Sequence, residues 1–178
     1  MATVVALGET IRGTAAEQLA DLRERIADLA DALAGERVVV TFGIGPQLEA
    51  ELSRQEHGVP DAPRLPLYVG VARAQAELAE LVATELRPVA GRPIACLQLH
   101  VLVEPDGGTP SAFRGAPVAE PLELVEREQV RALLDAGAIV VLGPGIPVAR
   151  RGEGLRGVEA VVDSSALLPG IDGKPLQT

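Results

Sequence analysis

The chain has 178 residues, of which 47% are hydrophobic, and its formal net charge is −9. This length supports one domain with a hydrophobic core, while the acidic balance argues against a nucleic-acid partner, because neutralising phosphates requires a basic face. No apolar run has membrane-spanning length, and no basic region precedes an apolar one at the N-terminus, so we expect a cytoplasmic protein with no membrane partner.

The first part of the chain predicts a strand, a helix and a second strand. Residues 3–7 read as a buried strand that ends in a loop at 8–10. Apolar residues at steps of three and four then predict a helix over 15–33, with Thr14 and Glu17 as a capping box at its start. Its charged residues, Arg25 among them, are expected on a solvated face. The second predicted strand covers residues 37–41.

The second strand enters a glycine pair, Gly43 and Gly45, which can turn the backbone sharply and expose its N–H groups. Pro46 suits the first turn of the helix that we predict to continue through residues 48–54. Exposed amides beside a helix N-terminus are typical of a site for phosphate, sulfate or carboxylate. The alternative is a plain strand-to-helix turn, because short glycine motifs are common.

The rest of the chain continues the alternation of helices and strands. Its predicted elements, in chain order, are a proline-rich loop (57–66), a helix (71–86), a loop (88–93), a strand (94–103), an irregular stretch (109–121), a helix (124–136), a strand (138–142) and a short strand (158–163). We predict an α/β fold, a three-layer sandwich with a mainly parallel sheet, over residues 1–168, and a polar C-terminal tail over 169–178.

Open α/β sheets bind ligands where parallel strands end. A second glycine turn, with Gly143 and Gly145, follows the strand at 138–142 and is expected to share that edge of the sheet with the first. His100, near the end of the strand at 94–103, and the acids Glu104 and Asp106 that follow it are candidates for proton transfer. The alternatives are a hydrogen-bonded core histidine and a solvated turn.

Several short segments match the pattern of a known family in the same order along the chain. Such an ordered set of matches is more specific than any single loop. The segments are residues 4–8, 13–18, 41–47, 65–67, 101–106, 130–137, 145–148 and 157–163. Together they resemble the N-terminal part of carbamate kinase, within the amino-acid kinase superfamily. The resemblance implies that family's fold without its nucleotide-binding half. In the family, the half that remains here binds the small substrate and provides much of the dimer contact.

The chain departs from the family pattern where that pattern serves phosphoryl transfer. Glu9 and Thr10 stand where the family has a glycine and an asparagine, and Ile44 replaces the asparagine between the two glycines. Pro144 removes an amide donor from the four-glycine loop. Lys174 is the only lysine in the chain, and both lysines of the family are missing.

Longer segments of the family also have no counterpart. Its flap-like subdomain is missing between Ala112 and Leu124, and residues 163–165 read Asp-Ser-Ser where the family has Asp-Lys-Asp. The chain stops where the nucleotide-binding half would begin. Phosphoryl transfer needs positive charge around the transferred group and a nucleotide pocket. We therefore expect a degenerate carbamate-kinase-like protein without kinase activity, which serves as a subunit of a heteromeric biosynthetic complex.

Such a chain is expected to form a homo-oligomer, or a heteromer with a related kinase-like chain, because loss of half the fold exposes apolar surface. A small anionic, amino-acid-derived molecule is the expected ligand. We expect no cofactor and no metal, since two distant histidines and scattered acids form no ligand cluster. The single cysteine, Cys96, also argues against a zinc site built from thiolates.

The alternative is an enzyme, or half of one, that assists departure of phosphate or sulfate in an elimination or ring closure on an amino-acid-derived substrate. One of the acids or His100 would then serve as the base. The candidate catalytic residues are Glu9, His100, Glu104 and Asp106. The candidate anion- or substrate-binding residues are Gly8, Thr10, Gly43, Gly45, Gln47, Gly143 and Gly145.

Overall fold

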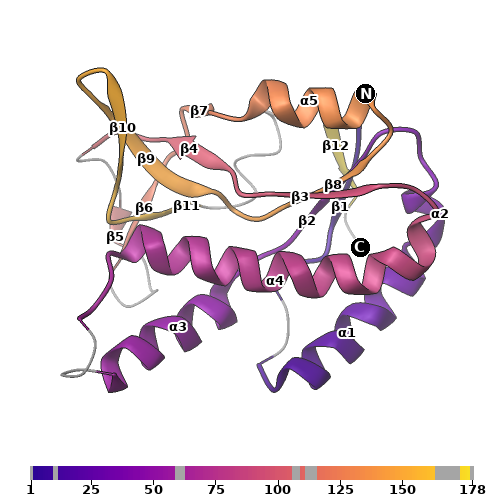
Figure 1. Cartoon of the computed structure of the whole chain (residues 1–178), viewed down its shortest axis with the longest axis horizontal. Coiled ribbons are helices and arrows are strands. Elements are labelled where there is room, and N and C mark those ends of the chain that lie inside the picture. Colours follow the sequence, from indigo (N-terminus) through magenta and orange to yellow (C-terminus); the bar gives the residue numbers. More distant parts are fainter. Residues whose placement is uncertain are drawn as a thin grey trace.

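A central sheet of five parallel strands organises the molecule (Figure 1), as the computed structural model shows. The structure describes residues 2–9, 12–58, 63–105, 109–110, 116–162 and 173–176. In sheet order, the strands are β12 (Gly173–Leu176), β1 (Ala2–Ala6), β2 (Val38–Thr41), β8 (Ile139–Leu142) and β3 (Ile94–Leu97). The predicted α/β class and mainly parallel sheet are confirmed.

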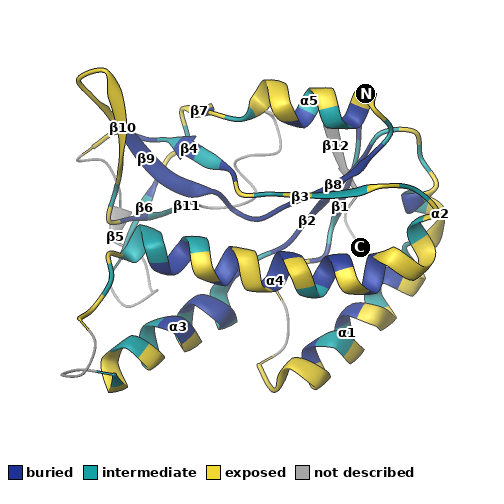
Figure 2. Cartoon of the chain, in the orientation of Figure 1, coloured by how far each residue is buried: buried dark blue, intermediate teal, exposed yellow. Residues whose placement is uncertain are grey.

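Both faces of the sheet are buried at its inner strands β2 and β8, which explains why these two strands are almost wholly apolar. Because side chains alternate along a strand, Val40 and Val141 point into one core, and Val39 and Val140 point into the other. Figure 2 shows β2 and β8 in the colour of buried residues. The sheet therefore has a layer packed against each face.

Three helices pack on one face of the sheet and one helix on the other (Figure 1). The first group is α1 (Ala15–Asp28), α3 (Gly45–His57) and α4 (Leu67–Ala90), with the short α2 (Ala30–Leu33) after α1, and the opposite helix is α5 (Arg127–Asp135). Val130 and Leu134 of α5 enter the second core with Val39 and Val140. This arrangement confirms the predicted three layers.

Two smaller sheets extend the second layer. One has the order β10-β9-β4-β7 and the other the order β11-β6-β5. The first contains β4 (His100–Leu102), β7 (Glu123–Leu124), β9 (Ile146–Arg151) and β10 (Gly154–Gly157), and the second contains β5 (Thr109–Pro110), β6 (Pro117–Ala119) and β11 (Val161–Val162). Short strands therefore interrupt the stretch that was predicted to be irregular over 109–121.

The single strand predicted over 94–103 is wrong, because the chain changes sheets in its middle. The side-chain amide of Gln98 donates to the Ala72 carbonyl at 2.9 Å, and the Leu99 carbonyl accepts from Ile146 N–H at 2.7 Å. The backbone thus leaves β8 and joins β9. An unbroken apolar run carries no signal for this change of partner.

Helix boundaries also differ from the predictions. The capping box of Thr14 and Glu17 is confirmed, but the predicted helix over 15–33 breaks at Leu29, whose φ and ψ are −105° and 9°. Helix α4 is longer at both ends than predicted and accommodates Pro88 near its C-terminus. Leu124 lies in β7, so the last helix begins three residues later than predicted, at Arg127.

The C-terminal segment differs from the predicted tail. Within residues 169–178, Gly173–Leu176 form β12, which pairs in parallel with β1. The edge of β1 would otherwise present unpaired N–H and C=O groups, which favours adding a strand there. In the described part of the chain, no helix is both long and apolar enough to cross a membrane.

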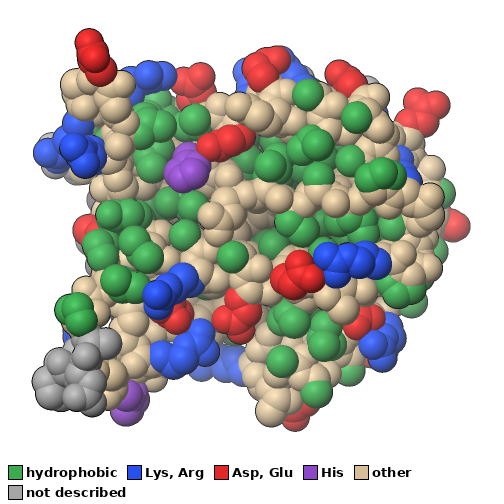
Figure 3. Space-filling view, viewed as in Figure 1, with side chains coloured by type: hydrophobic (Ala, Val, Ile, Leu, Met, Phe, Trp, Pro, Cys, Tyr) green, Lys and Arg blue, Asp and Glu red, His purple; other side chains and the backbone are tan. Residues whose placement is uncertain are grey.

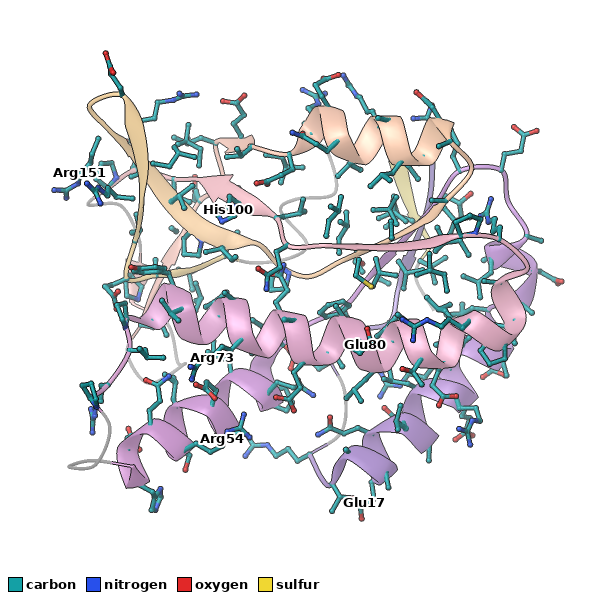
Figure 4. The ribbon with its side chains drawn as sticks, viewed as in Figure 1. Glu17, Arg54, Arg73, Glu80, His100 and Arg151 are labelled. Carbon is teal, nitrogen blue, oxygen red and sulfur yellow. The ribbon has the colours of Figure 1, made fainter. Side chains whose placement is uncertain are left out.

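A buried carboxylate, that of Glu51 in the middle of α3, joins α3 to α4. Glu51 is 6% exposed and accepts hydrogen bonds from Gln55 at 2.9 Å, from Arg73 at 2.9 Å and from Arg54 at 3.2 Å. Figure 4 shows Arg54 and Arg73 converging between the two helices. The hydrogen bond from Gln55, followed by those from Arg73 and Arg54, lowers the pKa of Glu51.

We predict that Glu51→Gln destabilises the protein by about 1–3 kcal/mol at neutral pH, because the hydrogen bonds to a charged group are weakened. A lowered folded-state pKa stabilises the protein fully above the unfolded value of about 4.3, and this contribution is lost as the pH falls through the folded value. Urea denaturation at decreasing pH measures the effect. The difference between wild type and variant should shrink in acid, whereas the exposed control Glu24→Gln should show little difference; a pH-independent difference contradicts the assignment.

Candidate functional site

Three loops meet at one edge of the central sheet because they follow three neighbouring parallel strands, β1, β2 and β8. Backbone hydrogen bonds join the first two loops: Leu7 N–H donates to the Thr41 carbonyl at 2.8 Å, and Gly43 N–H donates to the Gly8 carbonyl at 2.9 Å. One amide of the predicted anion-binding loop is therefore already used within the protein.

A pocket of about 200 Å³ lies between these loops. Its walls are mostly apolar, and Glu9 is the only charged residue among the described residues that line it. The lining residues are Glu9, Gly43, Ile44, Gly45, Leu48, Val71, Pro144, Gly145, Val161 and Val162. The loops after β1, β2 and β8 thus contribute to one site.

The side chain of Glu9 lies directly against the glycine pair. A Cβ atom added to Gly43 would lie 2.6 Å from Glu9 Oε1, and one added to Gly45 would lie 2.5 Å from Glu9 Oε2. Both distances are too short for real contacts, so the carboxylate occupies the space that the two missing side chains leave. The sequence left open whether Glu9 faces the crevice, and the structure places it there.

Arg25 of α1 positions the loop that carries Glu9. Its Nη1 donates to the carbonyl of Leu7 at 2.6 Å and to the carbonyl of Glu9 at 2.9 Å, while its Nη2 donates to Asp21 at 3.1 Å. The expectation that Arg25 belongs to a solvated face is therefore wrong. Helix periodicity reveals only which face of α1 is apolar, and it cannot reveal a bond to a distant loop.

Gln75 of α4 positions the third loop. It is fully buried, its Oε1 accepts a hydrogen bond from Gly145 N–H at 3.2 Å, and its Cγ would lie 2.4 Å from a Cβ atom added to Gly143. Gly143 is therefore required by this close approach. Gln75 was not predicted, although a signal exists: it is a polar residue on the apolar face formed by Val71 and Leu78.

Only some of the predicted binding residues lie at the pocket. Gly43, Gly45 and Gly145 line the pocket, whereas Gly143 lies buried against Gln75 and Gly8 is exposed with a φ of 68°. The side chain of Gln47 points toward α1, where its Nε2 donates to Gln18 Oε1 at 3.2 Å. Thr10 and Asp106 lie outside the described residues. The anion-binding role of the glycines, Thr10 and Gln47 stays a prediction, and so does the catalytic role of Asp106.

His100 is not brought to the pocket. It lies on β4 (Figure 4), where its Nδ1 is 2.7 Å from Glu126 Oε1 and its backbone N–H donates to Glu126 Oε2 at 2.7 Å. Glu104 is exposed just beyond β4, and it too does not line the pocket. Of the candidate acids and bases that the structure describes, only Glu9 shares a pocket with the glycine loops.

Comparisons with known proteins identify proteins that resemble this chain. No family model matches the chain. A carbamate kinase-like protein of Escherichia coli, YqeA, is 30% identical over an alignment of 207 residues that covers 89% of this chain. A carbamate kinase of Halobacterium salinarum is 26% identical over 90% of this chain. The chain spans 64% and 66%, respectively, of the lengths of these two relatives.

Among solved structures, a carbamate kinase of Giardia superimposes with a TM-score of 0.83. The match covers 99% of this chain and 73% of the Giardia chain, at 24% sequence identity. This likeness establishes a shared fold over almost the whole of the present chain.

We predict that Gly143→Ala destabilises the protein by about 1–3 kcal/mol, because the added methyl group meets the buried Cγ of Gln75 and neither side can move freely. Gly154→Ala is the matched control, since Gly154 faces open space and its substitution should change stability by less than about 0.5 kcal/mol. Urea denaturation of both variants makes the comparison. Equal stabilities would show that the third loop does not depend on this contact.

Proposed function

Because the chain has the carbamate kinase fold and is similar in sequence to carbamate kinases, we propose that it is a carbamate-kinase-like protein without kinase activity, which acts as a subunit of a heteromeric biosynthetic complex. The observation that carries the first part of the proposal is the position of Glu9 between the glycine loops. The second part of the proposal, the role as a subunit, is supported by hydrophobic residues exposed at the surface.

Glu9 opposes phosphoryl transfer by its charge. Catalysis of this transfer depends on positive groups around the transferred phosphoryl oxygens. The Glu9 carboxylate lies against both Gly43 and Gly45, so a phosphate in the same loops would be within a few ångströms of a like charge. Hydrogen bonding of Gly43 N–H to the Gly8 carbonyl removes a donor that the phosphate would use.

No compensating positive charge lines the pocket among the described residues. The chain has a single lysine, Lys174, and no arginine contributes to the pocket lining. Arg150 lies 3.7 Å from Glu123, and Figure 4 shows Arg151 at the outer end of the β9–β10 hairpin. These side chains therefore cannot replace the missing lysines at the glycine loops.

The surface supports a role as a subunit. Strand β3 is an edge of the central sheet, and Ile94, Ala95 and Leu97 are only partly buried there. Figure 3 shows hydrophobic side chains gathered on the viewed face, over the strands that run above α4. The more exposed large hydrophobic residues are Val89, Leu122, Val125 and Leu155. Such surface favours an interface with a partner chain.

The alternative, an enzyme with changed chemistry, draws support from one feature only. Glu9 shares the pocket with Gly43 and Gly45, which is the position needed for a base that removes a proton while a phosphate or sulfate leaves. His100, with its bond to Glu126, lies outside that pocket. This chemistry would therefore depend on Glu9 and on groups supplied by a partner.

We predict that the isolated chain does not bind ATP. Isothermal titration calorimetry with ATP and magnesium should give no heat beyond dilution, because no described residue that lines the pocket carries a positive charge for the phosphates. A carbamate kinase in the same buffer is the positive control. A micromolar dissociation constant for the isolated chain would contradict the proposed loss of kinase function.

We also predict that the isolated chain is not a stable monomer, because its exposed hydrophobic residues and free sheet edge favour association. Size-exclusion chromatography with light scattering at micromolar concentration should give a dimer or larger species, or a defined complex after co-expression with a related kinase-like chain. A compact species at the monomer mass of 18.5 kDa would count against the subunit role.

A further inference from the structure

We propose that the pocket between the glycine loops binds small primary amines as their ammonium ions, with the Glu9 carboxylate as the counter-ion. This inference rests on the proposed function in one respect: the pocket must be free of a transferred phosphoryl group. It replaces the anion expected from the sequence with a ligand of the opposite charge.

The Glu9 carboxylate is available for a ligand. Within the described residues, no hydrogen bond or ion pair to either of its oxygens is found. The nearby Arg25 donates to the backbone carbonyls of Leu7 and Glu9 and to the side chain of Asp21, and not to the Glu9 carboxylate. The charge of Glu9 therefore faces the pocket without a counter-charge from any residue that the structure describes.

The remaining walls fit an aliphatic chain. Aliphatic side chains from α3 and the residue just before it, from α4 and from β11 surround the cavity, together with the ring of Pro144. They are Ile44, Leu48, Val71, Val161 and Val162. A carboxylate at one side and apolar walls at the others match a ligand with an ammonium head and a short hydrocarbon tail. The pocket has a volume of about 200 Å³, which is below the range of drug-sized ligand pockets, so the ligand must be small.

The chemistry of the pocket selects an ammonium group over other cations. A metal ion needs several oxygen or nitrogen ligands, and the described residues contain no group of three or more acids, histidines or cysteines that could hold one. A guanidinium is planar and broad, whereas an ammonium is a compact charge with three donors. The two oxygens of Glu9 can accept two of these donors.

The test uses n-butylammonium as the probe and follows the amide chemical shifts of Gly43, Gly45 and Gly145 by NMR. We expect saturable shifts at these amides in the wild-type protein. Glu9→Gln, which keeps the shape of the side chain but removes its charge, should weaken binding by about tenfold or more. Glu24→Gln, an exposed acid on α1 outside the pocket, is the matched control and should bind as the wild type does.

Two further ligands test separately how the chain length and the charge of the ligand affect binding. Methylammonium should bind more weakly than n-butylammonium, by about two- to fourfold for each missing methylene group that contacts the apolar wall. Butyrate, which has the same chain and the opposite charge, should not bind the wild-type protein. Tighter binding of butyrate than of n-butylammonium, or an unchanged dissociation constant for the amine in Glu9→Gln, would overturn the proposal.

The outcome is distinguishable from that of the proposed function. A chain that binds both ATP and n-butylammonium would contradict the loss of kinase function but leave the amine site standing. A chain that binds neither would overturn the amine site alone. Shifts confined to residues outside the pocket would also overturn it, because they would place the amine elsewhere on this acidic protein.

Discussion

The contact of the Glu9 carboxylate with Gly43 and Gly45 is the constraint on which the site depends. The glycines leave room for it, and Arg25 holds its backbone through the carbonyls of Leu7 and Glu9. The same strand-end loops that suit an oxyanion in principle are here filled by an anion of the protein itself. In the proposed account, charge at this single position decides which ligands the pocket accepts.

The rest of the fold keeps this contact in place. Strands β1, β2 and β8 are parallel neighbours, so the loops that follow them are held at one edge of the sheet. Helix α4 supports two of the elements around the pocket, since its Gln75 binds the third loop and its Arg73 pairs with the buried Glu51 of α3. A rigid support of this kind fixes the pocket walls before any ligand binds.

The sequence predicts the layers better than it predicts the site. Unbroken apolar runs such as 38–41 and 139–142 identify buried parallel strands, because a strand covered on both faces needs apolar residues at every position. The change of sheet at Gln98, the role of Arg25 and the direction of Glu9 depend on contacts between distant segments, which no local pattern encodes. Gln75 is the exception, since a polar residue on an apolar helix face indicates a buried hydrogen bond.

The central claim, that Glu9 excludes phosphate from the glycine loops, is tested most directly by titrating inorganic phosphate while recording the amide chemical shifts of Gly43 and Gly45. In the wild-type protein these shifts should not change in a saturable way, because a like charge already lies against both glycines. In Glu9→Ala, with the loops free of that charge, saturable shifts are expected at the same amides. Saturable binding of phosphate to these amides in the wild-type protein would contradict the account.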